Sequence, residues 1–279
     1  MIYVAGRPFS LDSTMDFGRV ERVTIQQMLN SPEMFSYPSV NEFRFEINIR
    51  KNIMESAKEM NESQVTFTIF ESAYCNPTYW DLTNAGGFLL RPGVRPSDAI
   101  VDIYRNGSLY GFECATAIII IFYQAILKSV GRRHFDSIFQ NLYLYSWHTD
   151  PDLQLHIFNS NRFLPGDVVY FNNPDYHPNT PWYRGVNAVV LSDGSFFGHG
   201  VGIVTAEQMI EFLNSERSPG SMQPAYLANL ITRISPATLL ILTLQSHRNF
   251  YKKQKNVIHH NHCSISSFVY QFYLDNHND

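Results

Sequence analysis

The sequence predicts an α+β fold, and three observations support this prediction. Helical patterns occupy the first half of the chain, whereas strand patterns gather in the second half. An almost uninterrupted apolar run over residues 115–127 is typical of a helix that is buried on most of its sides. Segment 187–200 has two strand-like halves around Asp193-Gly194, which is a strong signal for an antiparallel hairpin.

Length and composition indicate one domain followed by a tail. The chain has 279 residues, of which 44% are hydrophobic, and this is ample for one large core. Because no linker rich in Pro, Gly or Ser interrupts residues 1–245, we predict a single domain there. Residues 246–279 lack a hydrophobic period, and we predict that they form a divergent, mobile tail, with local ordering open for the strand-like residues 266–274.

Charge, hydrophobicity and the first residues of the chain argue against nucleic acid and membrane partners. A net charge of −4 argues against nucleic acid, whose binding requires clustered basic residues. The apolar run of about 13 residues is shorter than the roughly 20 that a membrane span needs, so no membrane partner is expected. The first residues lack a basic region followed by an apolar core, so we expect synthesis in the cytoplasm without a signal peptide.

The cysteines indicate neither a disulfide framework nor a metal centre. Cys75, Cys114 and Cys263 are odd in number and widely spaced. The cluster His259, His260, His262 and Cys263 lacks the spacing of a zinc site, so we expect no metal and no cofactor.

Local signals place the elements along the chain. Ser39 and Glu42 form a predicted capping box at the start of a helix, and Gly131 ends the buried helix. Residues 64–70 suit either a strand or a helix end. The expected elements are a strand at 2–5, helices at 19–29, 39–60 and from 96, a hairpin at 78–90, a buried helix to 131, a helix at 132–141, strands at 142–146 and 168–171, the hairpin at 187–200, and helices at 205–214 and 224–234.

Cys114 stands out because it lies at the predicted start of the buried helix. The free N–H groups and the dipole of a helix N-terminus favour an anion, so the thiol is expected to be shifted toward thiolate. The alternative is a purely structural role, since free cysteine is among the most buried residue types.

His199 is the histidine with the strongest claim to a catalytic role. It lies in the predicted hairpin between Gly198 and Gly200, where the absence of neighbouring side chains would leave its ring accessible. It could instead be a half-buried polar residue of the sheet. Papain-like enzymes have a cysteine at a helix start and a histidine on an antiparallel sheet. They often carry a turn and strand similar to LPGDVVYF before that histidine.

At this point the sequence resembles a known family. Segments SAYCNPTYW, YGFECATAIIIIFYQA, LYLYSWH, FLPGDVVYF and YRGVNAVVLSDGSFFGHGVGI are similar to those of the protein-glutamine γ-glutamyltransferase (transglutaminase) of spore-forming bacteria. The similarity runs from residue 1 to about 243. The resemblance implies a single papain-like domain without calcium, which cross-links the glutamine and lysine side chains of spore-coat proteins and resides in the spore coat. It implies a catalytic role for Cys114, His199 and Glu113.

One position departs from the family. The family carries Glu in the segment R-G-E-N, whereas this chain has Val186 there. If the hairpin turn has two residues, His199 lies opposite Ala188 and residue 186 is its diagonal neighbour on the same face. If the turn has three residues, Asn187 lies opposite His199 instead, and Asn is an accepted third member in papain-like enzymes. Both registers stay open from the sequence.

A narrow apolar site would protect a thioester intermediate from water. The candidate walls of this substrate tunnel are aromatic, and each could equally be an ordinary core residue: Trp147, Trp182, Tyr183, Phe67 and Trp80, with Phe70 and Tyr79 as further candidates. Two other functions are considered, a thiol amidase or peptidase that transfers the acyl group to water, and a structural coat protein with weakened catalysis.

Overall fold

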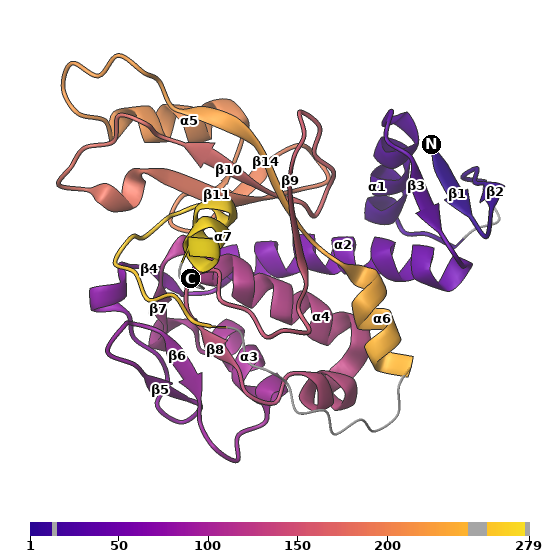
Figure 1. The fold of residues 1–279 in the computed structure, drawn as a ribbon, viewed down its shortest axis with the longest axis horizontal. Coiled ribbons are helices and arrows are strands. Elements are labelled where there is room, and N and C mark those ends of the chain that lie inside the picture. The colour runs from indigo at the N-terminus through magenta and orange to yellow at the C-terminus, as the bar shows by residue number, and fades with distance from the viewer. Residues whose placement is uncertain (13–15, 245–255, 277–279) are drawn as a thin grey trace.

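The computed structural model describes residues 1–12, 16–244 and 256–276, and it consists of a helical layer packed against an antiparallel sheet (Figure 1). The predicted mixture of helices and sheet is confirmed. The helical layer contains α2 (Val40–Glu62), α3 (Pro96–Arg105) and α4 (Cys114–Ile138). Ser39 caps α2 as predicted, since its side chain accepts a hydrogen bond from the backbone of Glu42 at 3.2 Å, whereas the Glu42 carboxylate accepts from the Ser39 hydroxyl at 3.3 Å instead of from the Ser39 backbone.

Helix α4 is the centre of the core. Every residue from Cys114 to Leu127 is buried. Gly131 has φ +76° and separates this helix from a second one that continues to Ile138, as the glycine in the sequence predicts. Among the described residues, α4 alone is long and apolar enough to cross a membrane, and 78% of its most apolar window is buried inside the protein. Such burial is typical of a core helix.

The large sheet separates two apolar clusters. Its strand order is β13-β12-β11-β10-β14-β9, and every pair is antiparallel. Because strand residues alternate between faces, Val186 and Ala188 pack with Met209 of α5 (Ala206–Ser215), whereas Val189 packs into the cluster that contains α2 and α4. The bounds are β9 (Leu155–Asn159), β10 (Val168–Asn172), β11 (Gly185–Val190), β12 (Phe196–Gly198), β13 (Gly202–Val204) and β14 (Tyr226–Ile234).

Three smaller sheets complete the description. Strands β1 (Ile2–Val4), β2 (Arg7–Pro8) and β3 (Phe35–Tyr37) pack with α1 (Arg19–Asn30) at the N-terminus. The predicted hairpin at 78–90 is β5 (Trp80–Leu82) and β6 (Phe88–Leu90), which β8 (Tyr143–Leu144) extends. Strand β4 (Thr66–Phe67) pairs in parallel with β7 (Gly111–Phe112), which leads directly into α4.

The prediction of a helix at 224–234 is wrong. These residues form β14, which lies between β10 and β9 and is paired along most of its length on both sides. Pro224 and the Ala and Leu residues after it suit a helix start, but two neighbouring strands satisfy the backbone groups of β14 instead. The helix comes later, as α6 (Pro236–Leu244).

A buried ion cluster joins the layers at the start of β10. The carboxylate of Asp167 accepts from Arg50 of α2 at 2.9 Å and from two nitrogens of Arg233 of β14, each at 2.8 Å. The two guanidinium groups hold the pKa of Asp167 below its usual range, although burial opposes this. The aspartate of the LPGD turn therefore fixes the sheet to α2.

The C-terminal segment departs from the predicted mobile tail over the residues that the structure describes. Residues 256–276 pack on the domain, and Ser264, Ile265 and Ser266 are each 5% exposed or less. The segment ends in α7 (Ser267–Asn276), whose first residue contacts Thr232 of β14. The other residues of the predicted tail, 246–255 and 277–279, lie outside the described residues, and the domain boundary at 245 stays a prediction.

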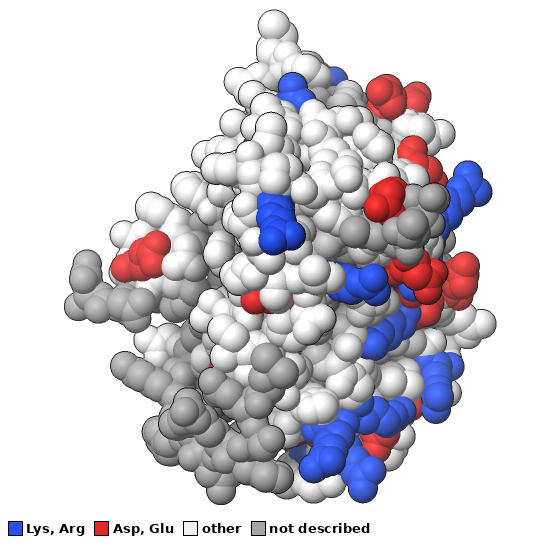
Figure 2. Space-filling model, turned by 90° about the vertical axis from the view of Figure 1, so that its right-hand side faces the viewer, with Lys and Arg blue, Asp and Glu red and all other residues white. Residues whose placement is uncertain are grey.

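The surface drawn in Figure 2 carries charges of both signs. Acidic and basic side chains are interspersed there, with basic side chains gathered toward the lower edge. Within the described ranges, no group of three or more His, Cys, Asp or Glu side chains is placed to hold a metal ion.

Candidate active site

Cys114 is the first residue of α4, and Glu113 caps that helix. The Glu113 carboxylate accepts from the backbone N–H groups of Ala115 at 2.8 Å and Thr116 at 2.6 Å, and from the Thr116 hydroxyl at 2.9 Å. Burial raises the pKa of Glu113, and these hydrogen bonds oppose the effect. Two of the N–H groups at the helix start, which favour an anion, are thus bonded to Glu113.

The hairpin that carries Asn187 and His199 has a three-residue turn. Ala188 pairs with Gly198, so Ser192, Asp193 and Gly194 form the turn and Asn187 lies opposite His199 as the register continues. The alternative with a two-residue turn is therefore wrong. The side-chain amide of Asn187 donates to Sγ of Cys114 at 3.4 Å. The structure thus brings Asn187 to the thiol.

His199 lies beside the segment that leads to Cys114. Its Nε2 is 3.1 Å from the carbonyl oxygen of Phe112, and since a carbonyl only accepts, Nε2 carries the proton. Burial lowers the pKa of His199 from 6.5 to about 4, although the carbonyls of Phe112 and Thr66 favour the charged form. Among the described residues, the hydrogen bond of Sγ of Cys114 is with Asn187 rather than with His199.

The space beside Gly198 and Gly200 is filled by neighbouring side chains, so these glycines do not expose the ring of His199. A Cβ at Gly200 would lie 2.8 Å from the ring of Phe67, and one at Gly198 would lie 2.8 Å from Met209. His199 is 6% exposed as a result. The prediction that the glycines leave its ring accessible is wrong for this conformation.

Val186 points away from the thiol. Asn187 faces Cys114, so its neighbour Val186 lies on the opposite face of β11, in the apolar cluster with Met209 and Ala188. Residue 186 is therefore not the same-face neighbour of His199 that a two-residue turn would make it. In this chain the position belongs to the core beneath α5.

Residues 263–267 cover the thiol. Cys114 is 1% exposed, and the backbone of Ser264 and Ile265 is bonded to the adjacent Glu113 and Asn187. Burial, followed by the charge of Glu113, raises the pKa of Cys114 to about 12, and the hydrogen bonds from Ser264 and Asn187 only reduce this effect. The expected shift toward thiolate is not found in this covered site, because desolvation outweighs the helix N-terminus.

The predicted aromatic walls separate into two groups. Trp147 contacts the covering segment through a hydrogen bond from Nε1 to the carbonyl of Ile265 at 2.9 Å, and Trp182 packs with the cluster that contains Cys263. The Phe67 ring lies 5.8 Å from that of His199. Trp80 is a core residue that is 1% exposed, and Tyr183 packs on Phe212 of α5 at 5.5 Å.

Sequence reasoning missed Tyr170 and Thr116. The Tyr170 hydroxyl donates to the carbonyl of Ser264 at 3.0 Å, and the Thr116 hydroxyl accepts from the backbone of Ser146 at 2.9 Å. A signal for Tyr170 was present in the LPGDVVYF strand, because Val169 and Phe171 pack beneath α5 and Tyr170 must face the other way. A tyrosine there needs a partner for its hydroxyl.

The fold and this site define a mixed helix-and-sheet protein with a buried cysteine at the start of its central helix. Comparisons with known proteins specify the family. The family model for protein-glutamine gamma-glutamyltransferase matches residues 1–243. The chain belongs to this family, and it is an enzyme with transglutaminase activity.

Individual relatives agree with the family match. The chain is 76% identical to a protein-glutamine gamma-glutamyltransferase of Halalkalibacterium halodurans over 275 residues, which cover 98% of this chain and 97% of the relative. It is 42% identical to one of Bacillus mycoides over 227 residues, 81% and 82% of the two chains. A solved structure titled transglutaminase from Geobacillus stearothermophilus, without C-terminal extension, is 42% identical and superposes with a TM-score of 0.70. It covers 76% of this chain and 100% of that chain.

Proposed function

We propose that this transglutaminase works through a thioester on Cys114 in a papain-like arrangement. The observation that supports this role is the thiol at the first position of α4, beside Asn187 and directly after Glu113. Sγ of Cys114 attacks the side-chain carbonyl carbon of a glutamine. The carbon–nitrogen bond breaks, and ammonia leaves with the proton that the thiol gave up.

A lysine side chain completes the transfer. Its neutral ε-amine attacks the thioester carbon, the carbon–sulfur bond breaks, and an ε-(γ-glutamyl)lysine bond forms. The amine loses one proton, and the cysteine sulfur regains one to restore the thiol. Water is the competing nucleophile, and the aromatic residues Trp147, Trp182 and Phe67 near the thiol limit its access.

His199 is proposed to carry the proton between the thiol and the leaving ammonia. A base must be neutral before it accepts, and the pKa of about 4 that burial gives His199 keeps it neutral at pH 7. Its ring lies against the carbonyl of Phe112, two residues before the nucleophile. Since Nε2 carries the proton, Nδ1 is the nitrogen that accepts, and it must come within reach of Sγ of Cys114 when substrate binds.

Asn187 and Glu113 receive different roles. Asn187 is proposed to orient the reacting sulfur, since its amide already donates to Sγ of Cys114. Glu113 is proposed to support the helix start, because both of its carboxylate oxygens accept from the first turn of α4. A carboxylate engaged in this way is a poor choice for a mobile general base.

The test is incorporation of a labelled primary amine into a glutamine peptide. Cys114→Ser should abolish incorporation, because a serine hydroxyl has a far higher pKa than a thiol. Cys75→Ser is the matched control, since Cys75 is a half-buried thiol outside the site, and it should keep wild-type activity. Mass spectrometry of the enzyme with the peptide alone should show an adduct of peptide minus ammonia on Cys114.

Other products would identify the alternatives. Release of the glutamate peptide without amine incorporation would indicate a thiol amidase. A folded wild-type chain that gives neither product would indicate a structural protein. Retained incorporation in Cys114→Ser would contradict the proposed nucleophile.

We further propose that the substrates are spore-coat proteins and that the enzyme works in the spore coat. This proposal is based on the resemblance to the transglutaminases of spore-forming bacteria. Its test compares spores of the source organism with and without the gene. Spores of the deletion strain should lose ε-(γ-glutamyl)lysine from the coat fraction, and an unchanged content would contradict the proposal.

A further inference from the structure

Residues 263–267 form a short segment that excludes solvent from the reacting groups. Each of these five residues is 6% exposed or less. Beneath them, Cys114, Glu113 and Asn187 are each 1% exposed. A protein glutamine cannot reach Sγ while this segment is in place. The segment lies beyond residues 1–243, which the family model matches.

The covering segment is held mainly through its backbone. The N–H of Ser264 donates to Glu113 at 3.4 Å, and its carbonyl accepts from the Tyr170 hydroxyl at 3.0 Å. The carbonyl of Ile265 accepts from Asn187 and from Trp147, each at 2.9 Å. Four side chains from separate parts of the chain therefore recognise the main chain of two consecutive residues. Backbone recognition of this kind accepts peptides of varied sequence.

Ser264 places a hydroxyl where a reacting group would be needed. Its hydroxyl is near enough to Cys114 to oppose the rise in the pKa of the thiol, and a hydroxyl offers no carbonyl carbon for the sulfur to attack. Ser264 also has φ +61°, in the left-handed region that non-glycine residues rarely adopt. A residue persists in that conformation when its surroundings fix it, and here the hydrogen bonds to Glu113 and Tyr170 do so.

We propose that residues 263–267 occupy the glutamine-substrate site as a pseudosubstrate, and that Glu113, Tyr170, Trp147 and Asn187 bind the main chain of the glutamine-bearing peptide in the same way. This inference depends on the proposed role of Cys114 as nucleophile. In this arrangement the enzyme is closed by its own C-terminal segment. Substrate binding requires the segment to leave.

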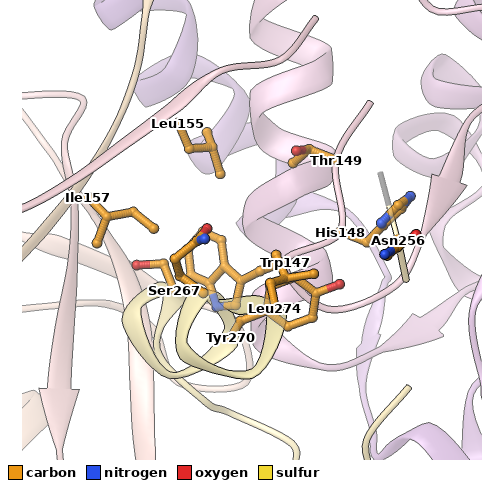
Figure 3. Close-up of a pocket in the computed structure, with 10 residues that line it drawn as sticks. Trp147, His148, Thr149, Leu155, Ile157, Asn256, Ser267, Tyr270 and Leu274 are labelled. Carbon is orange, nitrogen blue, oxygen red and sulfur yellow. The ribbon is translucent and has the colours of Figure 1, made fainter. Parts of the chain in front are cut away.

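Helix α7 anchors the segment through Tyr270, against which a cavity remains, and this incomplete packing favours release. Of its residues, Ser267 and Tyr270 are buried, and the Ser267 hydroxyl lies 2.6 Å from that of Thr232. A cavity of about 70 Å³ remains between the inner face of α7, Trp147 and the β9 residues Leu155 and Ile157 (Figure 3). A helix of ten residues is marginal by itself, so its stability depends on this incomplete packing.

The first experiment opens the segment in the full chain. Ile265 is 2% exposed, so Ile265→Asp places a carboxylate in the apolar core and should expel the segment. The rate of Cys114 alkylation by iodoacetamide should rise at least tenfold relative to Cys75 in the same molecules, and amine incorporation should rise in parallel. Ile241→Asp is the matched control, since Ile241 is 53% exposed on α6, and both rates should equal those of the wild type.

A second variant protects the test against misfolding. Ser264→Val is milder, because it adds no buried charge. A β-branched residue is strongly disfavoured at φ +61°, so this substitution should still release the segment. Equal alkylation of Cys114 in the wild type and in both folded variants would overturn the proposal. A different outcome is faster alkylation of Cys114 without amine incorporation in any variant. It would overturn the assignment of the covered site to the glutamine substrate, and it would also contradict Cys114 as the nucleophile.

The last experiment tests the main-chain contacts in the opened Ile265→Asp chain. Tyr170→Phe and Trp147→Phe each remove one donor, which should raise KM for the glutamine peptide about fivefold. The values of kcat and of KM for the amine should stay within about twofold, since neither donor touches the reacting atoms. Tyr104→Phe, which removes a buried hydroxyl of α3 outside the site, should leave all three constants unchanged. An unchanged KM for the peptide in both site variants would overturn the shared binding mode.

Discussion

At Cys114 two effects on one thiol oppose each other. A helix N-terminus stabilises the thiolate, whereas removal from water stabilises the thiol. In the covered site burial is the larger effect, and the pKa of Cys114 is raised to about 12. Uncovering the site would remove most of this desolvation while leaving the helix start in place. The reactivity of Cys114 therefore depends on the segment above it.

Two substitutions can decide whether Asn187 or Glu113 is the third catalytic residue beside Cys114 and His199. Asn187→Ala should lower kcat for amine incorporation more than tenfold, because it removes the donor to Sγ of Cys114. Glu113→Gln should act mainly on stability, with a loss of about 1–2 kcal/mol in unfolding free energy, since the carboxylate caps α4. Both quantities are measured for both variants, by urea unfolding and by the amine assay. A severe loss of kcat in a stable Glu113→Gln would restore Glu113 as the general base.

Position 186 provides a separate test of the register. Val186 is buried beneath α5, so Val186→Glu should lower the unfolding free energy by several kcal/mol and should not raise activity. Val186→Ile is the matched control, since it keeps an apolar side chain in the cluster and should cost less. Thermal unfolding and amine incorporation are measured for both. A stable and more active Val186→Glu would mean that residue 186 reaches His199 after all.

At the scale of elements, the sheet is attached to the helices by the start of β10. Asp167 is fully buried between Arg50 and Arg233, so the turn before β10, helix α2 and strand β14 converge on one carboxylate. This cluster sets the position of β10, and β10 in turn presents Tyr170 to the covering segment. A residue of the LPGD turn thereby influences a site that it does not contact.

Asp167→Asn should destabilise the protein by about 3–5 kcal/mol, because it removes the buried anion that the buried Arg50 and the partly buried Arg233 share, and only Arg50 keeps a second carboxylate, that of Glu46. Asp98→Asn is the control, since it breaks an exposed pair with Arg132 and should cost at most about 1 kcal/mol. Urea unfolding at pH 7 measures both. Equal losses in the two variants would contradict the structural role of the Asp167 cluster.

At the scale of the whole molecule, buried histidines link stability to pH. Burial lowers the pKa of His199 and of His260 to about 4, and His262 adds to the effect at His260. The unfolded chain therefore binds protons at a higher pH than the folded chain does. Their contribution to stability is complete above pH 6.5 and is lost as the pH falls from 6.5 toward 4.

For His199 alone this loss should amount to about 3 kcal/mol, at about 1.4 kcal/mol for each unit of pKa shift. Urea unfolding between pH 7.5 and 4.5 measures it. His199→Gln should flatten the pH dependence, whereas His156→Gln, at an exposed position, should keep it. A wild-type stability that does not change over this range would contradict the predicted pKa of His199.

Strong local patterns predicted much of the fold. The apolar run after Cys114 and Gly131 predicted the two helices of α4. Apolar residues on all sides of a helix indicate burial, and glycine favours the left-handed conformation that separates the two helices. Ser39 and Glu42 predicted the start of α2. The hairpin of Asn187 and His199 was predicted with two possible registers, since turn length depends on backbone conformation that Asp193-Gly194 alone does not specify.

The strand at residues 226–234 and the packing of the C-terminal segment depend on tertiary contacts. Residues 226–234 became a strand because β10 and β9 supply partners on both sides, which no local pattern contains. The C-terminal residues have no hydrophobic period, yet Ser264 and Ile265 are ordered by Glu113, Tyr170, Asn187 and Trp147. The sequence by itself determined which thiol lies at the start of the central helix. Whether that thiol is charged and accessible was decided by long-range packing, because desolvation depends on every segment that surrounds it.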